Sequence, residues 1–261
     1  MAYNQIMQWL INLYLILRNS IDFPLRRLIR WRRKGLEIHN EFKGEMFARF
    51  GPEKEMELNE IEVQLREKYW LQDFYDHSTV ENYLENLYYL QMLEAGLEGI
   101  EFPGPIITRV LDTGPSHWFY VQALGRYVHT NMGKGQSMTM EAYEIDPYRI
   151  YSDYYSRFDH AKAHIRQKFH SYFPDAYKPG EKKFDLVISF FPFVFLTDHL
   201  KWGLPIWNFK PSQMLNDQLE ALKHGGVLLI ANQGKDEQEK QLALLDDAGI
   251  TPIRALEFQS P

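Results

Sequence analysis

The chain has 261 residues, of which 45% are hydrophobic, 25% charged and 15% aromatic, as is typical of a folded globular protein. It contains no cysteine, which excludes disulfide bonds, thiolate metal sites and a cysteine nucleophile. The net charge is −6, but residues 1–34 carry seven basic side chains and one acid, which leaves 22 basic and 34 acidic residues beyond them. This acidic body argues against nucleic-acid binding, and we expect a cytoplasmic protein.

The chain begins with an apolar run, Ile6–Leu17, which a group of arginines follows. The run is too short for a transmembrane helix, which needs about 20 residues, and charge after the run is unlike a signal peptide. Asp22 and Pro24 predict the start of a second helix. Two interpretations stay open. We expect the apolar run to pack against the body or a partner subunit; in the alternative, residues 1–35 make peripheral contact with a membrane.

Residues 36–99 carry a helical pattern. Between residues 58 and 75, apolar side chains recur at three- and four-residue spacing with Glu and Lys between them. Ser78 or Thr79 can cap a further helix that ends near Gly99. Two prolines around a glycine then break the chain. We therefore assign residues 1–103 to a helical N-terminal region.

Beyond that break, residues 104–261 alternate between short apolar runs and amphipathic stretches. The pattern predicts strands at 106–111, 138–145, 183–191, 227–234 and 250–258, and helices at 118–128, 147–169, 211–226 and 236–249. Strands that alternate with helices predict an α/β fold with a mainly parallel sheet. Such sheets bind ligands beyond the carboxyl ends of their strands, so the residues directly after each strand are the candidate site.

Polar and small residues follow the first two strands. Asp112 ends the first strand, where its carboxylate can hold backbone amides or a bound amine, and Gly114 can take the positive φ of a sharp turn. Glu144 and Asp146 end the second strand, where an acid can accept hydrogen bonds from both hydroxyls of a ribose. Asp146 is also suited to cap a helix, because a proline follows it.

The later strands end in an aromatic wall and an amide. Phe190, Phe191, Pro192 and Phe193 follow one strand, and Asn232 follows the next. Each feature alone is common, but their order and spacing together are informative.

Four motifs carry a family resemblance: RVLDTG (109–114), YEID (143–146), FDLVISFFPF (184–193) and LEALKHGGVLLIANQG (219–234). With them, the chain from Ile107 to Phe258 resembles the class I S-adenosylmethionine-dependent methyltransferases, which have a Rossmann-like sheet. The last motif, a leucine and a lysine before two glycines and a hydrophobic strand, is the most specific of the four. The resemblance covers about 60% of the chain.

The resemblance implies S-adenosylmethionine as the cofactor and direct transfer of its methyl group, with no metal. It implies that Asp112, Gly114 and Ser116 surround the amino-acid end of the cofactor, and that Glu144 and Asp146 lie by the ribose. Trp118 would fill space near the methionine end or stack on the cofactor. On the acceptor side it implies Phe190, Phe191, Pro192, Phe193 and Asn232.

The chain also departs from the family pattern. Of the positions usually held by glycine, 114 keeps it, while 116 and 118 carry Ser and Trp. Phenylalanines replace the polar residue that holds an acceptor amine in amino-methylating relatives, so we do not expect nucleic-acid or protein N-methylation. The sheet is expected to close with one strand where the family has two, and the open edge invites a protein partner. These departures leave a second hypothesis open, that of an inactive methyltransferase-like scaffold or assembly subunit.

Three histidines are further candidates. His160 and His164 lie four residues apart on a predicted helix, a spacing at which two histidines can share a metal, but no third ligand is evident. We expect them on a solvated helix face. His117 lies close to the expected crevice and is either a general base or, as we favour, a turn residue.

Overall fold

The computed structural model describes residues 2–102, 109–132, 138–181 and 183–260. Five strands form one sheet in the order β3-β2-β1-β4-β5, and all neighbouring strands are parallel. Their bounds are β1 Arg109–Thr113, β2 Thr139–Tyr143, β3 His170–Phe173, β4 Phe184–Phe190 and β5 Leu222–Ala231. The predicted α/β fold with a mainly parallel sheet is confirmed.

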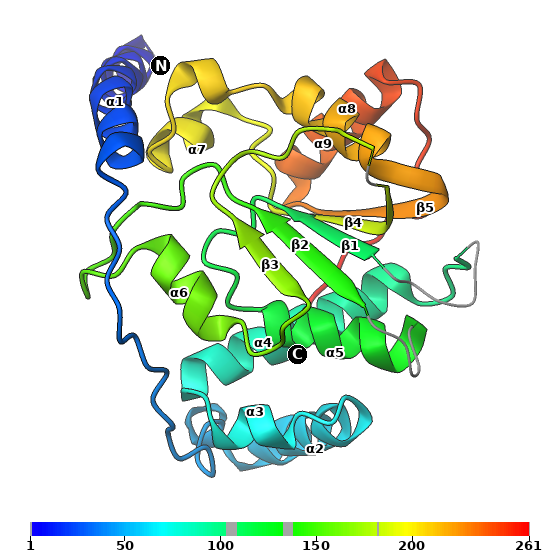
Figure 1. Cartoon of the computed structure of the whole chain (residues 1–261). Helices are drawn as coiled ribbons and strands as arrows, with labels where there is room; N and C mark the ends of the chain where they lie inside the picture. Colours follow the sequence, from blue (N-terminus) through cyan, green and yellow to red (C-terminus); the bar gives the residue numbers. More distant parts are fainter. Residues whose placement is uncertain (1, 103–108, 133–137, 182, 261) are drawn as a thin grey trace.

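Helices cover both faces of this sheet (Figure 1). On one face lie α4 (Val80–Leu97) and α5 (Val121–Met132), and on the other α8 (Pro211–Ala221) and α9 (Lys235–Asp247). The side chain of Thr79 caps α4 by accepting from the backbone N–H of Asn82, as one of the two predicted caps.

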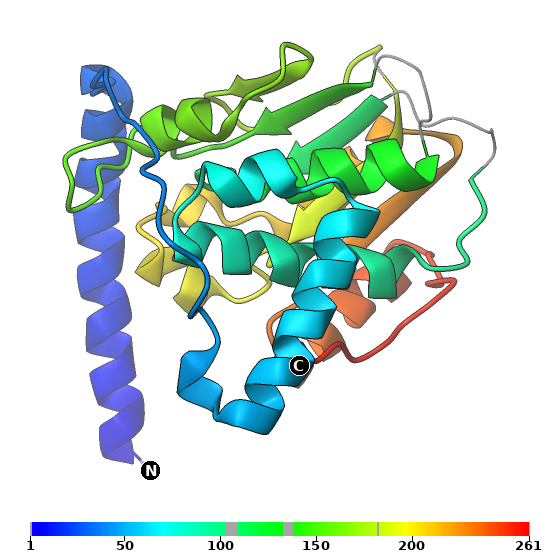
Figure 2. The same cartoon turned by 90° about the horizontal axis from the view of Figure 1, so that it is seen from below.

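The N-terminal helices share a core with the sheet. α2 (Pro52–Lys68) and α3 (Gln72–Asp76) pack outside α4 and α5 (Figure 2). Their buried residues join Val110, Val121 and Met140 in one hydrophobic cluster, with Tyr69 and Leu71 of the α2–α3 connection fully buried. The helical pattern expected from residue 36 starts later in the structure, because residues 36–43 have no regular secondary structure and only the 3₁₀ turn η1 (Ala48–Phe50) lies between them and α2.

The N-terminal segment is one helix, α1 (Ala2–Ile29), which runs along one side of the molecule (Figure 2). The prediction of a second helix at Asp22 was wrong, since Pro24 lies inside α1. A proline inside a helix costs about 3 kcal/mol, and here contacts of Asn19 and Arg26 with the body hold the helix on both sides of it. None of the described helices has the length and hydropathy needed to cross a membrane.

The segment predicted as one helix at 147–169 contains only α6 (Arg157–His164). Ser156 and Asp159 form a capping box that starts the helix, a local signal present in the sequence. The chain then turns into β3, which the sequence analysis missed. Residues of β3 alternate between buried and half-buried. Four residues are too few to predict a strand from the sequence, and parallel pairing with β2 holds them in this conformation.

The helix predicted to run to residue 226 ends at Ala221, and β5 starts at once. The two glycines of the fourth motif therefore belong to the strand. Gly225 has φ +76° at an irregularity of the β4–β5 pairing, and a Cβ on Gly226 would lie 2.9 Å from the carbonyl oxygen of Phe184.

The last predicted strand, at 250–258, is absent from the described residues. Pro252 cannot donate to a ladder, and Ile253 is 82% exposed. The tail instead returns to α4, where the ring of Phe258 lies 5.5 Å from that of Tyr88 and Arg254 donates to the carbonyl of Glu98. β5 is thus an edge strand of the described sheet.

Candidate functional site

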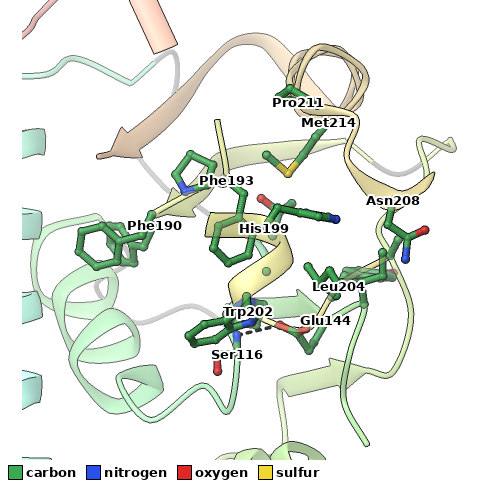
Figure 3. A pocket seen from close by; sticks show the side chains of 18 of the residues that line it. Ser116, Glu144, Phe190, Phe193, His199, Trp202, Leu204, Asn208, Pro211 and Met214 are labelled. Carbon is green, nitrogen blue, oxygen red and sulfur yellow. Dashed lines mark hydrogen bonds between the residues drawn. The ribbon is translucent and has the colours of Figure 1, made fainter. Parts of the chain in front are cut away.

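A cavity of about 940 Å³ opens at the carboxyl ends of β1, β2 and β4 (Figure 3). Thr113 and Gly114 line it from β1, Glu144 from β2, and Phe190 and Phe191 from β4. The cavity lies by the junction of β1 and β4, where the order in which the chain adds strands to the sheet reverses, and this is the position expected for a ligand site in such a sheet. The sequence prediction that strand ends form the site is therefore consistent with the cavity.

The loop after β1 has a left-handed backbone at three alternate positions, although only the first of them is a glycine. Gly114, Ser116 and Trp118 all have positive φ, at 75°, 56° and 49°. This conformation costs a residue with a side chain roughly 1–2 kcal/mol. Such residues persist where their surroundings hold them, and they cluster at binding sites.

Three hydrogen bonds hold this loop. The N–H of Ser116 donates to Glu144 Oε2 at 2.9 Å, and the hydroxyl of Tyr172 donates to the carbonyl of Ser116 at 2.5 Å. The N–H of Gly114 donates to the carbonyl of Tyr143 at 2.9 Å. The loop is therefore tied to β2 and β3 at both ends.

Trp118 lies in the core beneath the loop. Its side chain is fully buried, and its Nε1 donates to Asp112 Oδ2 at 2.9 Å. The hydroxyl of Tyr120 donates to the same oxygen at 2.8 Å. Neither Trp118 nor Asp112 is among the described residues that line the cavity, so the indole does not take the position against the cofactor that the resemblance implied, and Asp112 holds side chains instead of backbone amides.

Asp112 has an unusual environment for a carboxylate. Burial raises its pKa to about 7, against the hydrogen bonds from Tyr120 and Trp118 and together with the nearby charge of Glu144. Its Oδ1 is buried and has no partner among the described residues. A carboxyl that is protonated over much of the acidic range satisfies this environment better than an anion.

Of the three predicted acids, Glu144 is the one that lines the cavity. Its Oε1 accepts from the N–H of Asp146 at 2.8 Å and its Oε2 from Ser116, while Arg157 Nη1 lies 3.5 Å from Oε1. Burial raises the pKa of Glu144, and Arg157 works against that shift. A carboxylate offers about four lone-pair sites, so each oxygen retains one for a ligand.

Asp146 is fully buried and does not line the cavity among the described residues. Arg26 donates to both of its oxygens, at 3.0 and 2.9 Å, and Arg157 Nη1 lies 3.8 Å away. The carboxylate therefore ties α1 to the end of β2, a role that the sequence analysis did not foresee.

The predicted aromatic wall faces the cavity. Phe190, Phe191, Pro192 and Phe193 all line it, and Figure 3 labels the first and last of them. Tyr89 and Tyr120 also line the cavity and pack against Phe190, with ring centroids 5.1 and 5.3 Å from its own. Phe191 has φ +55°, and its N–H donates to the carbonyl of Ala231 at 2.8 Å. Asn232 does not line the cavity in the described part of the chain, whereas its neighbour Gln233 does.

His199 is a cavity residue that the sequence analysis missed. It lies on the short helix α7 (Leu196–Lys201), which has no pattern of its own in the sequence, and is 3% exposed (Figure 3). Its Nε2 is 2.9 Å from the carbonyl oxygen of Pro205. Because a carbonyl only accepts, Nε2 carries the proton and Nδ1 is an acceptor. Burial lowers the pKa of His199, against the Pro205 hydrogen bond.

The three histidines singled out in the sequence lie together beside the loop, with the rings of His160 and His164 5.9 and 6.1 Å from that of His117. His117 lines the cavity, and burial lowers its pKa to about 3. His160 Nε2 lies 2.9 Å from Asp153 Oδ2, and His164 is 7% exposed. The prediction of a solvated face was wrong for His164, because α6 turns this residue toward His117.

No protein-family model matches the chain, and no curated protein matches it. Solved structures share its fold loosely. A methyltransferase from Aquifex aeolicus is 16% identical with a TM-score of 0.41, over 65% of this chain and 91% of that one. A chain of the Haloferax volcanii complex between the Trm112 methyltransferase activator and a methyltransferase is 17% identical with a TM-score of 0.38, over 57% and 54%.

The plantazolicin methyltransferase BpumL, solved in complex with SAH, is 10% identical with a TM-score of 0.38, over 74% of this chain and 67% of that one. The chain spans about half the length of the Haloferax volcanii chain that it matches. Identities this low concern the fold alone, and the strand order of the sheet remains the basis for the fold assignment.

Proposed function

We propose that the protein is an S-adenosylmethionine-dependent methyltransferase. The observation that carries the proposal is the loop after β1, with positive φ at Gly114, Ser116 and Trp118, held by Glu144 at the edge of a large cavity. Two of these three residues bear the strain of a left-handed backbone. A loop that only had to connect β1 with α5 would not need that conformation.

The residues present fit the cofactor in three respects. A Cβ on Gly114 would meet no atom within 4 Å, so the backbone there is open to a ligand. Glu144 has lone pairs left for two ribose hydroxyls. The cavity volume, about 940 Å³, is at the upper end of the range for small-molecule sites.

S-adenosylmethionine, when bound, supplies an activated methyl group on a positively charged sulfur. The chain's part is to hold donor and acceptor in line and to exclude water. The ring faces of Tyr89, Tyr120 and Phe190 favour a cation within about 6 Å, and they are packed together, with the rings of Tyr89 and Tyr120 stacked at 4.3 Å. A rigid wall of this kind supplies orientation, which can account for much of a transfer rate.

On the acceptor side, we propose that His199 takes a proton at Nδ1. The hydrogen bond to the carbonyl of Pro205 fixes the tautomer of His199, and the lowered pKa of His199 favours the neutral ring. A neutral imidazole can remove the proton of a hydroxyl as the methyl group arrives. An oxygen acceptor with an apolar body would suit both this base and the phenylalanine wall.

An inactive scaffold is the second candidate. The observation that favours it is that the candidate acids already have protein partners: Asp112 binds Trp118 and Tyr120, and Asp146 binds Arg26. In that case a protein partner would meet the outer edge of β5 or the helix α1.

Calorimetric titration with S-adenosylmethionine decides between the two. We expect binding by the wild type and, for Glu144→Gln, affinity lower by about tenfold or more, since hydrogen bonds to a charged group contribute about 1.5–3 kcal/mol. Asp175→Asn is the control, because this acid has an exposed side chain and does not line the cavity. No heat with the folded wild type would reject the cofactor and favour the scaffold.

A further inference from the structure

α1 has one face on the body and the opposite face in solvent. Leu15, Asn19 and Phe23 are 7%, 1% and 8% exposed and lie along the inner face. We call the opposite face the outward stripe. Its members are apolar and between 40% and 79% exposed: Met7, Trp9, Leu10, Leu13, Tyr14, Leu17, Ile21, Leu25 and Leu28.

Hydrogen bonds prevent the helix from turning this stripe inward. Asn19 Nδ2 donates to the carbonyls of Leu200 and Leu204, at 2.8 and 2.9 Å. Two turns further along the helix, Arg26 donates to Asp146 and to the carbonyl of Gly203. The orientation of α1 about its axis is fixed, so the stripe is exposed as a consequence of the fold.

The charges next to the stripe are positive. Arg30, Arg32, Arg33 and Lys34 directly follow α1, are all exposed, and have no ion pair within the described part of the chain. The one acid of α1, Asp22, lies 4.0 Å from Arg18. An apolar face that ends in a basic segment is complementary to an anionic lipid surface.

The width of the outward stripe favours a lipid surface over a second helix as its partner. At 100° per residue, Trp9 and Leu25 bound an arc of about 160°, which is wider than the seam of a two-helix coiled coil. The neighbouring turn η2 (Ile206–Asn208), which contacts α1, adds Ile206 and Trp207 at 41% and 48% exposure. A broad surface of this kind suits a planar, deformable partner.

We propose that α1 docks the protein on anionic lipid bilayers, lying in the interface with the outward stripe in the acyl boundary and residues 30–34 at the headgroups. The helix, about 40 Å long, would lie along the membrane plane. The carbonyl of Leu204, a residue of the cavity wall, accepts a hydrogen bond from Asn19 on the inner face of α1, so docking brings the cavity close to the lipid. This proposal is independent of cofactor binding.

Sedimentation with lipid vesicles tests it on the full-length protein. We expect the wild type to bind vesicles containing phosphatidylglycerol and to bind pure phosphatidylcholine vesicles much less. The double variant Leu17→Glu/Ile21→Glu should lose at least tenfold in partitioning, because two apolar side chains no longer enter the acyl boundary. Phe42→Glu/Ile253→Glu is the control, since both residues are 82% exposed outside α1, and it should bind like the wild type.

A second pair of variants tests the charges. Arg30→Gln/Lys34→Gln should lower partitioning into the phosphatidylglycerol vesicles about thirtyfold, equivalent to about 2 kcal/mol. The wild type should also release as salt is added. A wild type that ignores the anionic vesicles overturns the proposal, as does binding that Leu17→Glu/Ile21→Glu leaves unchanged. A dimer in ultracentrifugation that this variant dissociates, without vesicle binding, would assign the stripe to a second copy.

Discussion

At the scale of single residues, Asp112 makes stability depend on pH. Its folded pKa of about 7 lies above the ordinary 3.8, so the folded chain holds an extra proton between these values. Stability is then lost as the pH rises through this window, by at most about 4 kcal/mol. Asp112→Asn cannot ionise. In urea titrations from pH 4 to 8, we expect its free energy of unfolding to rise relative to the wild type. Parallel curves for the two proteins would mean that Asp112 is ionised throughout.

A second residue-scale prediction concerns the proton on His199. The ¹⁵N shifts of its ring should show the Nε2–H tautomer at neutral pH and titration below 6.5, because burial lowers the pKa and Pro205 accepts from Nε2. His199→Gln keeps an N–H for that carbonyl, whereas His199→Phe leaves it without a donor. Thermal unfolding should therefore show His199→Phe less stable than His199→Gln by about 1–2 kcal/mol. An Nδ1–H tautomer would contradict the proposed proton acceptor.

At the scale of elements, backbone strain and side-chain packing have opposite effects on stability in the loop after β1. Trp118→Gly relieves a left-handed residue, a gain of roughly 1–2 kcal/mol, but removes a fully buried indole, a loss of about 3–5 kcal/mol. Packing is the larger effect, and we expect a net loss of about 3 kcal/mol in chemical denaturation. Ser116→Gly shares the positive φ without the buried ring, so we expect it to be neutral or up to about 1 kcal/mol more stable. A Trp118→Gly variant as stable as Ser116→Gly would contradict the larger effect of packing.

The elements also show how far local pattern reaches. The strands β1, β2 and β4 were predicted because each lies in a short, mainly apolar run between amphipathic stretches. β3 was missed, since its four residues owe their conformation to pairing with β2. The strand predicted at 250–258 was wrong, because Phe258 packs on Tyr88 of α4 while Ile253 is exposed. Pairing and packing are tertiary events that short-range periodicity does not encode.

In the candidate site, too, the sequence predicts position better than it predicts tertiary contacts. Gly114, Glu144 and the wall from Phe190 to Phe193 were predicted from strand ends and line the cavity. Trp118 and Asp146 were predicted with them but satisfy partners inside the fold. Strand order predicts where residues gather, whereas the direction of each side chain depends on neighbours distant in sequence.

At the scale of the whole molecule, one buried ion pair joins the N-terminal helix to the sheet. Asp146 is fully buried, and Arg26, with a side chain 20% exposed, donates to both of its oxygens. Arg26→Met would leave Asp146 with Arg157 alone, at 3.8 Å. Breaking one partner of a buried pair costs about 3–5 kcal/mol, and we expect about 3 because a second arginine remains.

The control is Arg30→Met, one residue beyond the same helix, whose exposed side chain has no ion pair in the described part of the chain and which should change stability by less than about 1 kcal/mol. Urea unfolding measures both variants, and hydrogen exchange of the α1 amides reports where the loss occurs. If α1 is an integral part of the fold, Arg26→Met lowers global stability, and protection falls in α1 and β2 together. If exchange rises in α1 alone with global stability unchanged, the helix is an independent arm, and its fixed orientation, on which the outward stripe depends, would be refuted.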